Sequence, residues 1–231
     1  MLIHGLQKLT LLDYPGRVAC TVFIAGCGLN CPFCHNSDLI GIPEDYYCDD
    51  RELIEFLKKR KGLLDGVCLT GGEPLMNPGT PDLMAAIKDL GYSVKLDTNG
   101  SMPGPLGKVL ERGLCDYVAM DIKNSRERYA ETVGRKSFDV SLVEESLRLL
   151  RESGVEHELR TTVVRELHDE DSFRDIASWC AGSEKYFLQA FADRDTVRYE
   201  GLSAPSQEEM RRYREILLPS FSEVSVRRME V

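Results

Sequence analysis

Short apolar runs alternate with amphipathic segments along nearly the whole chain. Runs of roughly four to eight residues, rich in β-branched and other apolar side chains, have the composition of buried strands. The strands predicted in this way cover 17–24, 67–70, 92–96, 117–120, 158–164 and 186–189, with a final short strand at 221–226. Because a segment of helical period follows each of the first six, the pattern predicts serial βα units.

Helix-start signals stand between these strands. Three predicted helices begin with the spacing of a capping box, in which an N-cap side chain and an acidic residue three positions later each bind the other's backbone N–H. These pairs are Asp49 with Glu52, Ser141 with Glu144, and Ser206 with Glu209. Thr80 followed by Pro81 has the sequence of an N-cap with proline at the first helical position. Further helices are expected at 106–112 and 173–180.

About six βα units in series predict an α/β fold with a parallel sheet and right-handed crossovers. Six units are fewer than the eight of a closed (β/α)8 barrel. We therefore expect a complete or partial barrel, or an open doubly wound sheet. No linker-like tract divides the chain, so we expect a single domain over residues 1–231, with its core at about 17–191 and a C-terminal helix and short strand at 206–226.

Composition narrows the classes of function. The chain has 231 residues, of which 42% are hydrophobic, and a formal net charge of −9. This acidic balance argues against general nucleic-acid binding, and no apolar run approaches the ~18–20 residues that a membrane helix needs. The N-terminus lacks the basic and apolar regions of a signal peptide. We expect a cytoplasmic protein that binds neither nucleic acid nor membranes.

Three of the eight cysteines are clustered directly after the first predicted strand, at Cys27, Cys31 and Cys34. Three thiolates on one tight loop can bind three irons of a [4Fe–4S] cluster and leave the fourth iron open to a substrate or cosubstrate. The alternative is a zinc site with His35 as fourth ligand, for which His35 and its neighbour Cys34 would both have to turn towards one ion. The remaining cysteines are interpreted as small buried apolar side chains: Cys20, Cys48, Cys68, Cys115 and Cys180.

Glycine and polar residues follow the second and third predicted strands, at the strand ends where parallel α/β folds bind ligands. Gly71, Gly72 and Glu73 form an ordinary turn on one interpretation. On the other, paired glycines let the backbone approach a ligand, and its carbonyls accept hydrogen bonds from an ammonium group. Asp97 and Thr98 begin an Asp-Thr-Asn-Gly segment, which is typical of a turn and again follows directly after a predicted strand.

Charged and polar residues also mark the later strands. Asp121 and Lys123 are either a surface charge pair or ligand groups, with the lysine reaching a carboxylate and the aspartate binding a hydroxyl or a cation. Arg160 lies on an apolar strand and needs an anionic partner, either a side chain or a ligand, because burying an unpaired charge is costly. Gln189 points inward or stands at a strand end, where it makes structural or ligand hydrogen bonds.

The combination of these motifs resembles the radical S-adenosylmethionine (SAM) superfamily over roughly residues 6–191. The cysteine spacing is specific for that superfamily when an aromatic residue, here Phe33, precedes the last cysteine. Within the superfamily the chain is similar to the activases of glycyl-radical enzymes. The motifs that carry this similarity are Asp13-Tyr-Pro-Gly16, Cys34-His35-Asn36, Asp97-Thr-Asn-Gly100 and Asp121-Ile-Lys123. The run 5–16 is most similar to activating proteins of anaerobic ribonucleoside-triphosphate reductases.

The resemblance implies a partial (β/α)6 barrel with a [4Fe–4S] cluster on Cys27, Cys31 and Cys34, and SAM beside it. It implies the following contacts to SAM: Phe33 and His35 with the adenine; Gly71, Gly72 and Glu73 with the methionine ammonium; Lys123 and Arg160 with the carboxylate. In pyruvate formate-lyase activase, residues matching Asp97, Thr98 and Asp121 bind a monovalent cation near SAM. Gln189 completes the set of expected cofactor-binding residues.

The implied chemistry is one-electron reduction of SAM by the cluster to methionine and a 5′-deoxyadenosyl radical, which takes a hydrogen atom from a glycine of a partner enzyme. No acid–base residue of the chain is required. The implied partners are a glycyl-radical enzyme, namely anaerobic (class III) ribonucleotide reductase, and an electron donor such as flavodoxin or ferredoxin. The alternatives are a radical SAM enzyme with a small-molecule substrate, such as 7-carboxy-7-deazaguanine synthase, and a non-catalytic zinc or cluster module.

Two departures from the activases stand out. Only 36 residues separate Cys34 from Gly71, and they include just two cysteines, Cys48 and Cys68, so the cysteine-rich insert of some activases is absent. Phe191 stands where pyruvate formate-lyase activase has a histidine. This second departure speaks against pyruvate formate-lyase as the substrate.

Overall fold

A computed structural model describes residues 1–227 of the chain, so residues 228–231 of the predicted domain lie outside the described residues. The strands are β1 Leu2–Ile3, β2 Gly5–Thr10, β3 Ala19–Ile24, β4 Cys48–Asp49, β5 Gly66–Gly71, β6 Ser93–Thr98, β7 Tyr117–Asp121, β8 Glu156–Val163, β9 Lys185–Ala190 and β10 Glu223–Arg227. The α-helices are α1 Asp50–Lys59, α2 Thr80–Asp89, α3 Pro103–Glu111, α4 Tyr129–Thr132, α5 Ser141–Ser153, α6 Glu170–Trp179 and α7 Gln207–Leu217. Short 3₁₀ helices are η1 Ser37–Leu39, η2 Pro74–Met76 and η3 Leu218–Ser220.

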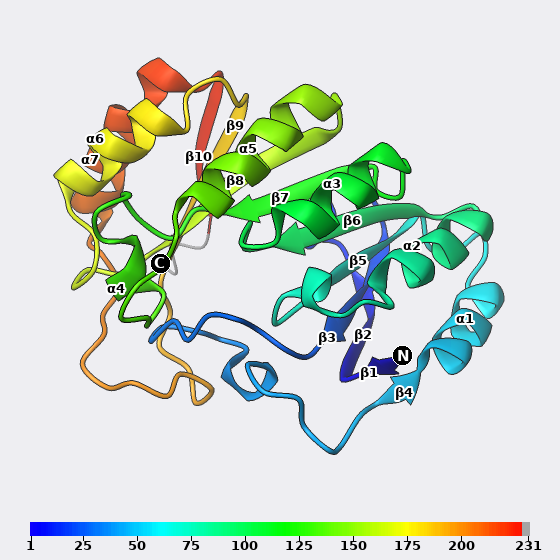
Figure 1. Ribbon diagram of the computed structural model, residues 1–231. Coiled ribbons are helices and arrows are strands. Elements are labelled where there is room, and N and C mark those ends of the chain that lie inside the picture. Colours follow the sequence, from blue (N-terminus) through cyan, green and yellow to red (C-terminus); the bar gives the residue numbers. More distant parts are fainter. Residues whose placement is uncertain (228–231) are drawn as a thin grey trace.

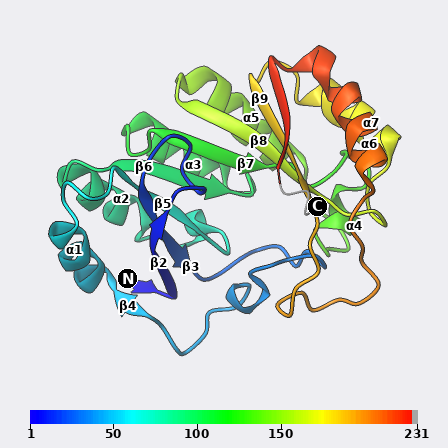
Figure 2. The ribbon, with the colours of Figure 1, turned by 180° about the vertical axis from the view of Figure 1, so that it is seen from behind.

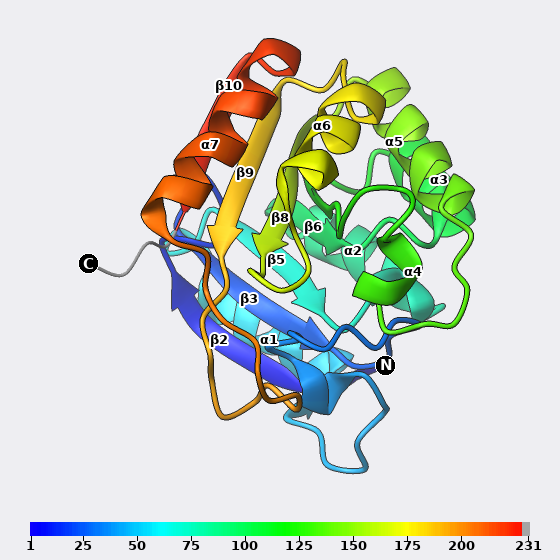
Figure 3. The ribbon, with the colours of Figure 1, turned by 90° about the vertical axis from the view of Figure 1, so that its left-hand side faces the viewer.

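Eight strands form one curved sheet in the order β10-β9-β8-β7-β6-β5-β3-β2 (Figure 1). All neighbours are parallel except β2, which pairs antiparallel with β3. Within residues 1–227 the edge strands β2 and β10 do not pair with each other, and Figure 3 shows the sheet curving from one to the other. The predicted α/β partial barrel with six βα units is confirmed. The edge strand β2 was not predicted, because its sequence Gly-Leu-Gln-Lys-Leu-Thr has no regular alternation.

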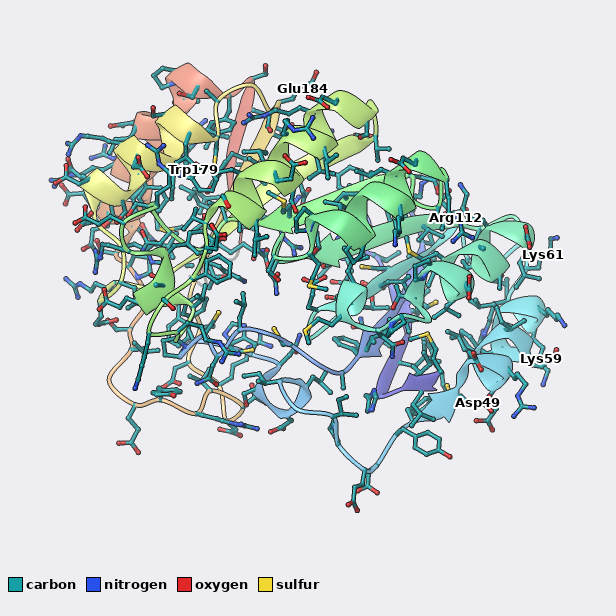
Figure 4. All side chains as sticks on the ribbon, viewed as in Figure 1. Asp49, Lys59, Lys61, Arg112, Trp179 and Glu184 are labelled. Atoms are coloured by element: carbon teal, nitrogen blue, oxygen red, sulfur yellow. The ribbon has the colours of Figure 1, made fainter. Side chains whose placement is uncertain are left out.

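Two of the three capping boxes predicted from the sequence are present in the structure. Asp49 caps α1 and Ser206 caps α7, each with the expected reciprocal bonds. Figure 4 shows Asp49 and Lys59 at opposite ends of α1, as the helix dipole favours. The box predicted at Ser141 is wrong. Ser141 is already inside α5, and its hydroxyl donates to Asp139 instead, 2.6 Å away.

The start of α2 also differs from expectation. Gly79 is the N-cap, and Thr80 is the first residue of the helix rather than its cap. The buried hydroxyl of Thr80 donates to the Pro74 carbonyl at 2.6 Å. This bond ties α2 to η2, directly after the glycine pair, and so helps to hold the end of β5 in place.

The outer face of the sheet is apolar, and its inner face carries polar and charged side chains. The longer helices lie along its outer face (Figures 1 and 2), and the main apolar core lies between them and the sheet. On β6, Val94 and Leu96 belong to this core, whereas Lys95 and Asp97 point to the inside of the curve. Alternation along each strand therefore places polar groups inside the barrel. Among residues 1–227, no helix is long and apolar enough to cross a membrane.

The loop between β2 and β3 closes the end of the barrel where the parallel strands begin. Tyr14 is 2% exposed and packs against Tyr117, with ring centroids 6.1 Å apart. Gly66 makes room for it, since a Cβ there would lie 2.9 Å from the Tyr14 ring. The Thr21 hydroxyl donates to Asp13 at 2.6 Å. Tyr14 thus has a structural role at the end opposite the strand-end motifs, whereas Asp13 faces the interior of the barrel.

Candidate functional site

A cavity of about 400 Å³ lies inside the curve of the sheet, at the C-terminal ends of the strands. Its volume is in the range of about 300–1,000 Å³ that is usual for small-molecule sites. All predicted site residues except Glu73 line it. These are Cys27, Cys31, Phe33, Cys34, His35, Gly71, Gly72, Asp97, Thr98, Asp121, Lys123, Arg160 and Gln189. The fold therefore brings together motifs from the ends of six strands.

Backbone hydrogen bonds hold the cysteine loop on both sides. On one side, Cys27 N–H donates to the Ile40 carbonyl at 3.0 Å. On the other, Asn30 N–H donates to the Val133 carbonyl at 2.9 Å, after α4. Gly134 adjoins this contact with φ +65°, and a Cβ there would lie only 2.0 Å from the Asn30 oxygen. The loop is therefore fixed by distant segments rather than by its own sequence.

The three cysteines are partly exposed and line the cavity wall. Burial raises the pKa of Cys27, and it raises the pKa of Cys31 to about 12 although Lys123 acts in the opposite direction. Loading with iron must therefore release protons. Three thiols on one loop, beside a cavity with room for a further ligand, fit a [4Fe–4S] cluster with one open iron.

The alternative zinc site receives no support from the arrangement. Nowhere in the part of the chain that the structure describes do three or more His, Cys, Asp or Glu side chains lie close enough to hold one metal ion. The His35 ring instead faces the β9–α7 connection, where Nε2 is 2.8 Å from the Ala192 carbonyl oxygen. It also stacks on Phe191, with centroids 5.8 Å apart. Figures 1 and 2 show this connection running beside the one that follows β3.

Aromatic side chains form the wall near His35. Phe33 is 4% exposed and packs in a small apolar cluster with Phe191, Val164 and Leu167. The Lys123 ammonium lies 6.0 Å from the centroid of the Phe33 ring. Flat apolar surface beside a cation suits a ligand with an aromatic ring and a negative group.

The glycine pair is required by close backbone packing. Gly71 has φ +124°, and a Cβ there would lie 2.4 Å from the Ile24 carbonyl oxygen. A Cβ on Gly72 would lie 2.3 Å from the Gly26 carbonyl oxygen. Both contacts press the end of β5 against the segment that enters the cysteine loop. The glycines therefore let the cavity wall and the cysteine loop meet, whatever ligand binds beside them.

The Glu73 carboxylate does not line the cavity, so the expected contact of this motif with SAM would come from its backbone. The carboxylate is fully buried and accepts hydrogen bonds from Leu75 N–H at 3.1 Å, Thr98 Oγ1 at 2.9 Å and Asn99 N–H at 2.7 Å. Burial raises the pKa of Glu73 to about 7, although these donors lower it. The side chain thus ties the end of β5 to the end of β6, and only the backbone of this motif is available to a ligand.

Five charged side chains form a ladder across the cavity floor, alternating in sign from β6 to β8. Lys95 binds Asp97, and Asp97 Oδ2 accepts from Arg160 Nη1 at 3.2 Å. Arg160 Nε donates to Asp121 Oδ1 at 3.0 Å, and Asp121 Oδ2 accepts from Lys123 Nζ at 3.0 Å. Three cations face two anions, so the ladder has one positive charge in excess. The excess charge favours an anionic group of a ligand in the cavity.

The ladder keeps its carboxylates ionised. Burial alone would raise the pKa of Asp121, but Arg160 and Lys123 outweigh it and lower this pKa to about 2. Burial likewise opposes ionisation of Asp97, and Arg160 and Lys95 lower its pKa in spite of it. The anionic partners expected for Arg160 are therefore two side chains, Asp97 and Asp121.

This pairing predicts that bound Na⁺ or K⁺ is not required. Asp97 and Asp121 were expected to bind a monovalent cation, but each already has two cationic partners. A further cation would meet the excess positive charge of Lys95, Lys123 and Arg160. SAM affinity of the reconstituted protein, measured by isothermal titration calorimetry, should therefore agree within about twofold in choline, Na⁺ and K⁺ chlorides at equal ionic strength. Tighter binding in one metal salt alone would contradict this.

Several residues in and near the site were not predicted from the sequence, among them Lys95, Asn99 and Arg194. Lys95 is 2% exposed inside the barrel and pairs with Asp97. Like Arg160, Lys95 is a charged residue on a predicted strand, and this feature is visible in the sequence. Asn99 was noted only as part of a turn, but its side chain donates to Cys27 Sγ, 3.6 Å away. Cys68, interpreted as an apolar filler, is buried but faces the polar interior, with Sγ 3.7 Å from Asp97 Oδ1.

Comparison with known proteins adds an independent line of support. The sequence model described as the radical SAM superfamily matches residues 21–180, a range that includes the cysteine triplet and the charged ladder. A protein of Methanocaldococcus jannaschii, provisionally named a glycyl-radical enzyme activating enzyme, is 28% identical over 237 residues. That alignment covers 98% of this chain and 95% of the relative.

A second relative supports the same family, and a solved structure supports the fold. A pyruvate formate-lyase-activating enzyme of Clostridium pasteurianum is 29% identical over 185 residues, covering 76% of this chain and 74% of the relative. The crystal structure of a radical SAM methyltransferase from Sphaerobacter thermophilus superposes with a TM-score of 0.73 at 17% identity. It covers 95% of this chain and 68% of that one, and at this identity it supports the fold alone.

Proposed function

The chain belongs to the radical SAM superfamily, and from this premise we propose that it activates a glycyl-radical enzyme, with anaerobic ribonucleotide reductase as the partner. The observation that carries the proposal is the near full-length similarity to a relative named as such an activating enzyme, together with a cysteine loop that lines an open cavity. The chain is also similar to a pyruvate formate-lyase-activating enzyme over about three quarters of each protein.

We propose that Cys27, Cys31 and Cys34 hold the cluster and that the rest of the cavity holds SAM. The backbone of Gly71 and Gly72 would receive the ammonium group, and the excess positive charge near Lys123 and Arg160 would receive the carboxylate. The assignment of the adenine to the wall near Phe33 and His35 is supported by the aromatic surface there. Asp97, Thr98 and Asp121 would act by orienting these groups, and Gln189 by hydrogen bonding from β9.

When bound, the cluster and SAM supply a one-electron cleavage that yields a radical able to take a hydrogen atom from glycine. The chain's own residues position these groups and limit the access of water. Phe23, Leu29 and Ile40 contribute apolar lining beside the cysteine loop. Such shielding favours reaction of a radical with the intended donor over side reactions. An external one-electron donor, such as flavodoxin or ferredoxin, completes the proposal.

Electron paramagnetic resonance of an anaerobic mixture tests the proposed function. The cluster is reconstituted, and dithionite, SAM and a candidate anaerobic reductase are added. A doublet signal from a glycyl radical on the reductase is the expected result. A reductase in which the radical-site glycine is replaced by alanine is the matched control and should give no doublet.

Two other results would contradict the proposal in different ways. Formation of 5′-deoxyadenosine without a radical on any partner would favour a small-molecule substrate, as in 7-carboxy-7-deazaguanine synthase. Absence of deoxyadenosine altogether, from protein with an intact cluster and bound SAM, would favour a non-catalytic module.

A further inference from the structure

The sulfur of Cys27 accepts two N–H hydrogen bonds from the protein. One comes from the backbone N–H of Leu29, with nitrogen and sulfur 3.4 Å apart. The other comes from the side-chain amide of Asn99, 3.6 Å away and 72 residues further along the chain. The first belongs to the cysteine loop itself, whereas the second is made only because the loops that follow β3 and β6 meet across the end of β5.

The Asn99 side chain is held in one orientation. Its Oδ1 accepts from Ser101 N–H at 2.9 Å, which leaves the Nδ2 group to face the sulfur. Its backbone N–H donates to Glu73 at 2.7 Å, and only 6% of the residue is exposed. With both ends of the amide in use and the backbone anchored, this donor points at Cys27 without needing to reorganise.

A donor aimed at a thiolate ligand favours the more negative state of an iron–sulfur centre. Hydrogen bonds to the ligand sulfurs are among the determinants of the reduction potential of such centres. Reduction adds one negative charge to the cluster, and the partial positive charge of the N–H group stabilises that charge. Removing the donor should therefore make the centre harder to reduce.

We propose that Asn99 is a positioning residue that raises the reduction potential of the cluster through its hydrogen bond to Cys27. The inference rests on the proposed function for the presence of the cluster, and it adds a role for a residue outside the expected ligand set. This role requires no contact between Asn99 and SAM or substrate. It acts through the sulfur of Cys27 and sets how readily an external donor can load the cluster with an electron.

Two substitutions of Asn99 remove its hydrogen bond to Cys27 while keeping the acceptor that its turn needs. Asn99→Asp keeps an oxygen acceptor for Ser101 and replaces the donor with a negative charge. Asn99→Ser also keeps an acceptor for the turn, but its hydroxyl is too short to reach Cys27. Asn36→Ser is the matched control, because the Asn36 amide lines the same cavity and donates to the Gly71 carbonyl at 3.0 Å instead of to sulfur.

The experiment is a dithionite titration of the reconstituted variants, followed by electron paramagnetic resonance without SAM or partner enzyme. At a fixed potential, the ratio of reduced to oxidised cluster should fall about tenfold in Asn99→Asp, which is about 59 mV for a one-electron couple. It should fall by a smaller factor in Asn99→Ser and stay unchanged in Asn36→Ser. Thermal melting of each variant checks that it is folded.

Three results would overturn the proposal. These are wild-type potentials in both Asn99 variants, a shift in Asn99→Asp alone, and an equal shift in Asn36→Ser and Asn99→Ser. The second would mean that added charge, not the lost hydrogen bond, is responsible. Since neither SAM nor a partner is present, a failure here is distinguishable from a failure to form a glycyl radical.

Discussion

Replacing Cys31 with alanine is expected to remove the iron–sulfur cluster from the reconstituted protein. Cys31 is the middle one of the three proposed cluster ligands, and it lines the cavity close to Lys123. Without it only two thiols of the loop remain, and a cluster held by two protein ligands is exposed to loss and oxidation. Iron and acid-labile sulfide per chain should fall to background, and SAM cleavage should fall with them.

Two further variants make this test specific. Cys115→Ala removes a buried thiol that belongs to the apolar core, outside the cavity, so its iron and sulfide should match the wild type. His35→Ala should also keep its metal, whereas a zinc site with His35 as ligand would lose it. If Cys31→Ala retained as much iron and sulfide as Cys115→Ala, the ligand assignment would be wrong.

Replacing Arg160 with leucine is expected to lower the free energy of unfolding at pH 7 by about 3–5 kcal/mol, the usual cost of removing one partner from a buried ion pair. Arg160 is 13% exposed and lies between Asp97 and Asp121, which are 15% and 27% exposed. Without the guanidinium, two carboxylates would face each other in the cavity floor, and each would keep only a lysine as partner. Urea unfolding followed by circular dichroism measures the loss.

The loss should depend on pH in a defined direction. In the wild type the pKa of Asp121 is lowered to about 2, below its usual value of 3.8, so its contribution to stability is present above pH 3.8 and is lost as the pH falls through 2. In Arg160→Leu, loss of the guanidinium and the like charge of the two carboxylates raise the pKa values of both aspartates relative to the wild type. The penalty of the variant is then largest at neutral pH and shrinks as the pH falls and the aspartates of the variant become protonated before those of the wild type.

Two controls show whether the buried position is what matters. Arg174→Leu removes an arginine that is 56% exposed on α6 and pairs with Glu170 and Asp171. Its cost should be within about 1 kcal/mol, as for other surface ion pairs. Arg160→Lys keeps the positive charge but cannot bridge two carboxylates. Its loss of unfolding free energy should therefore lie between the losses of Arg160→Leu and Arg174→Leu. Equal losses in Arg160→Leu and Arg174→Leu would show that the ladder does not stabilise the fold.

Local sequence signals identified most of the fold and of the cavity lining. The βα alternation depends on side-chain periods that are set within each segment, so the six units could be predicted without knowing how they pack. The cysteine triplet is equally local, because its three members lie within eight residues. Even the need of Arg160 for an anion follows from one strand, since burial of a lone charge is unfavourable wherever the strand lies.

The partners of these residues depended on the register between strands. Arg160 lies opposite Asp121 because β7 and β8 pair in parallel at that position, and the pairing of β6 with β7 brings Asp97 within reach. Sequence alone left open whether Arg160 meets a ligand or a side chain. The same dependence explains Glu73, whose carboxylate turns away from the cavity because donors at the end of β6 lie behind it.

The sequence by itself therefore determined the kind of fold, the cysteine ligands to be expected and the edge of the sheet where chemistry is placed. Those features follow from periodicity, spacing and charge over a few neighbouring residues. Only the tertiary structure decided that Lys95 and Arg160 occupy the aspartates expected to bind a cation, and that Asn99 reaches Cys27. Such contacts join residues from different strands, and their geometry exists only once the strands are aligned in the sheet.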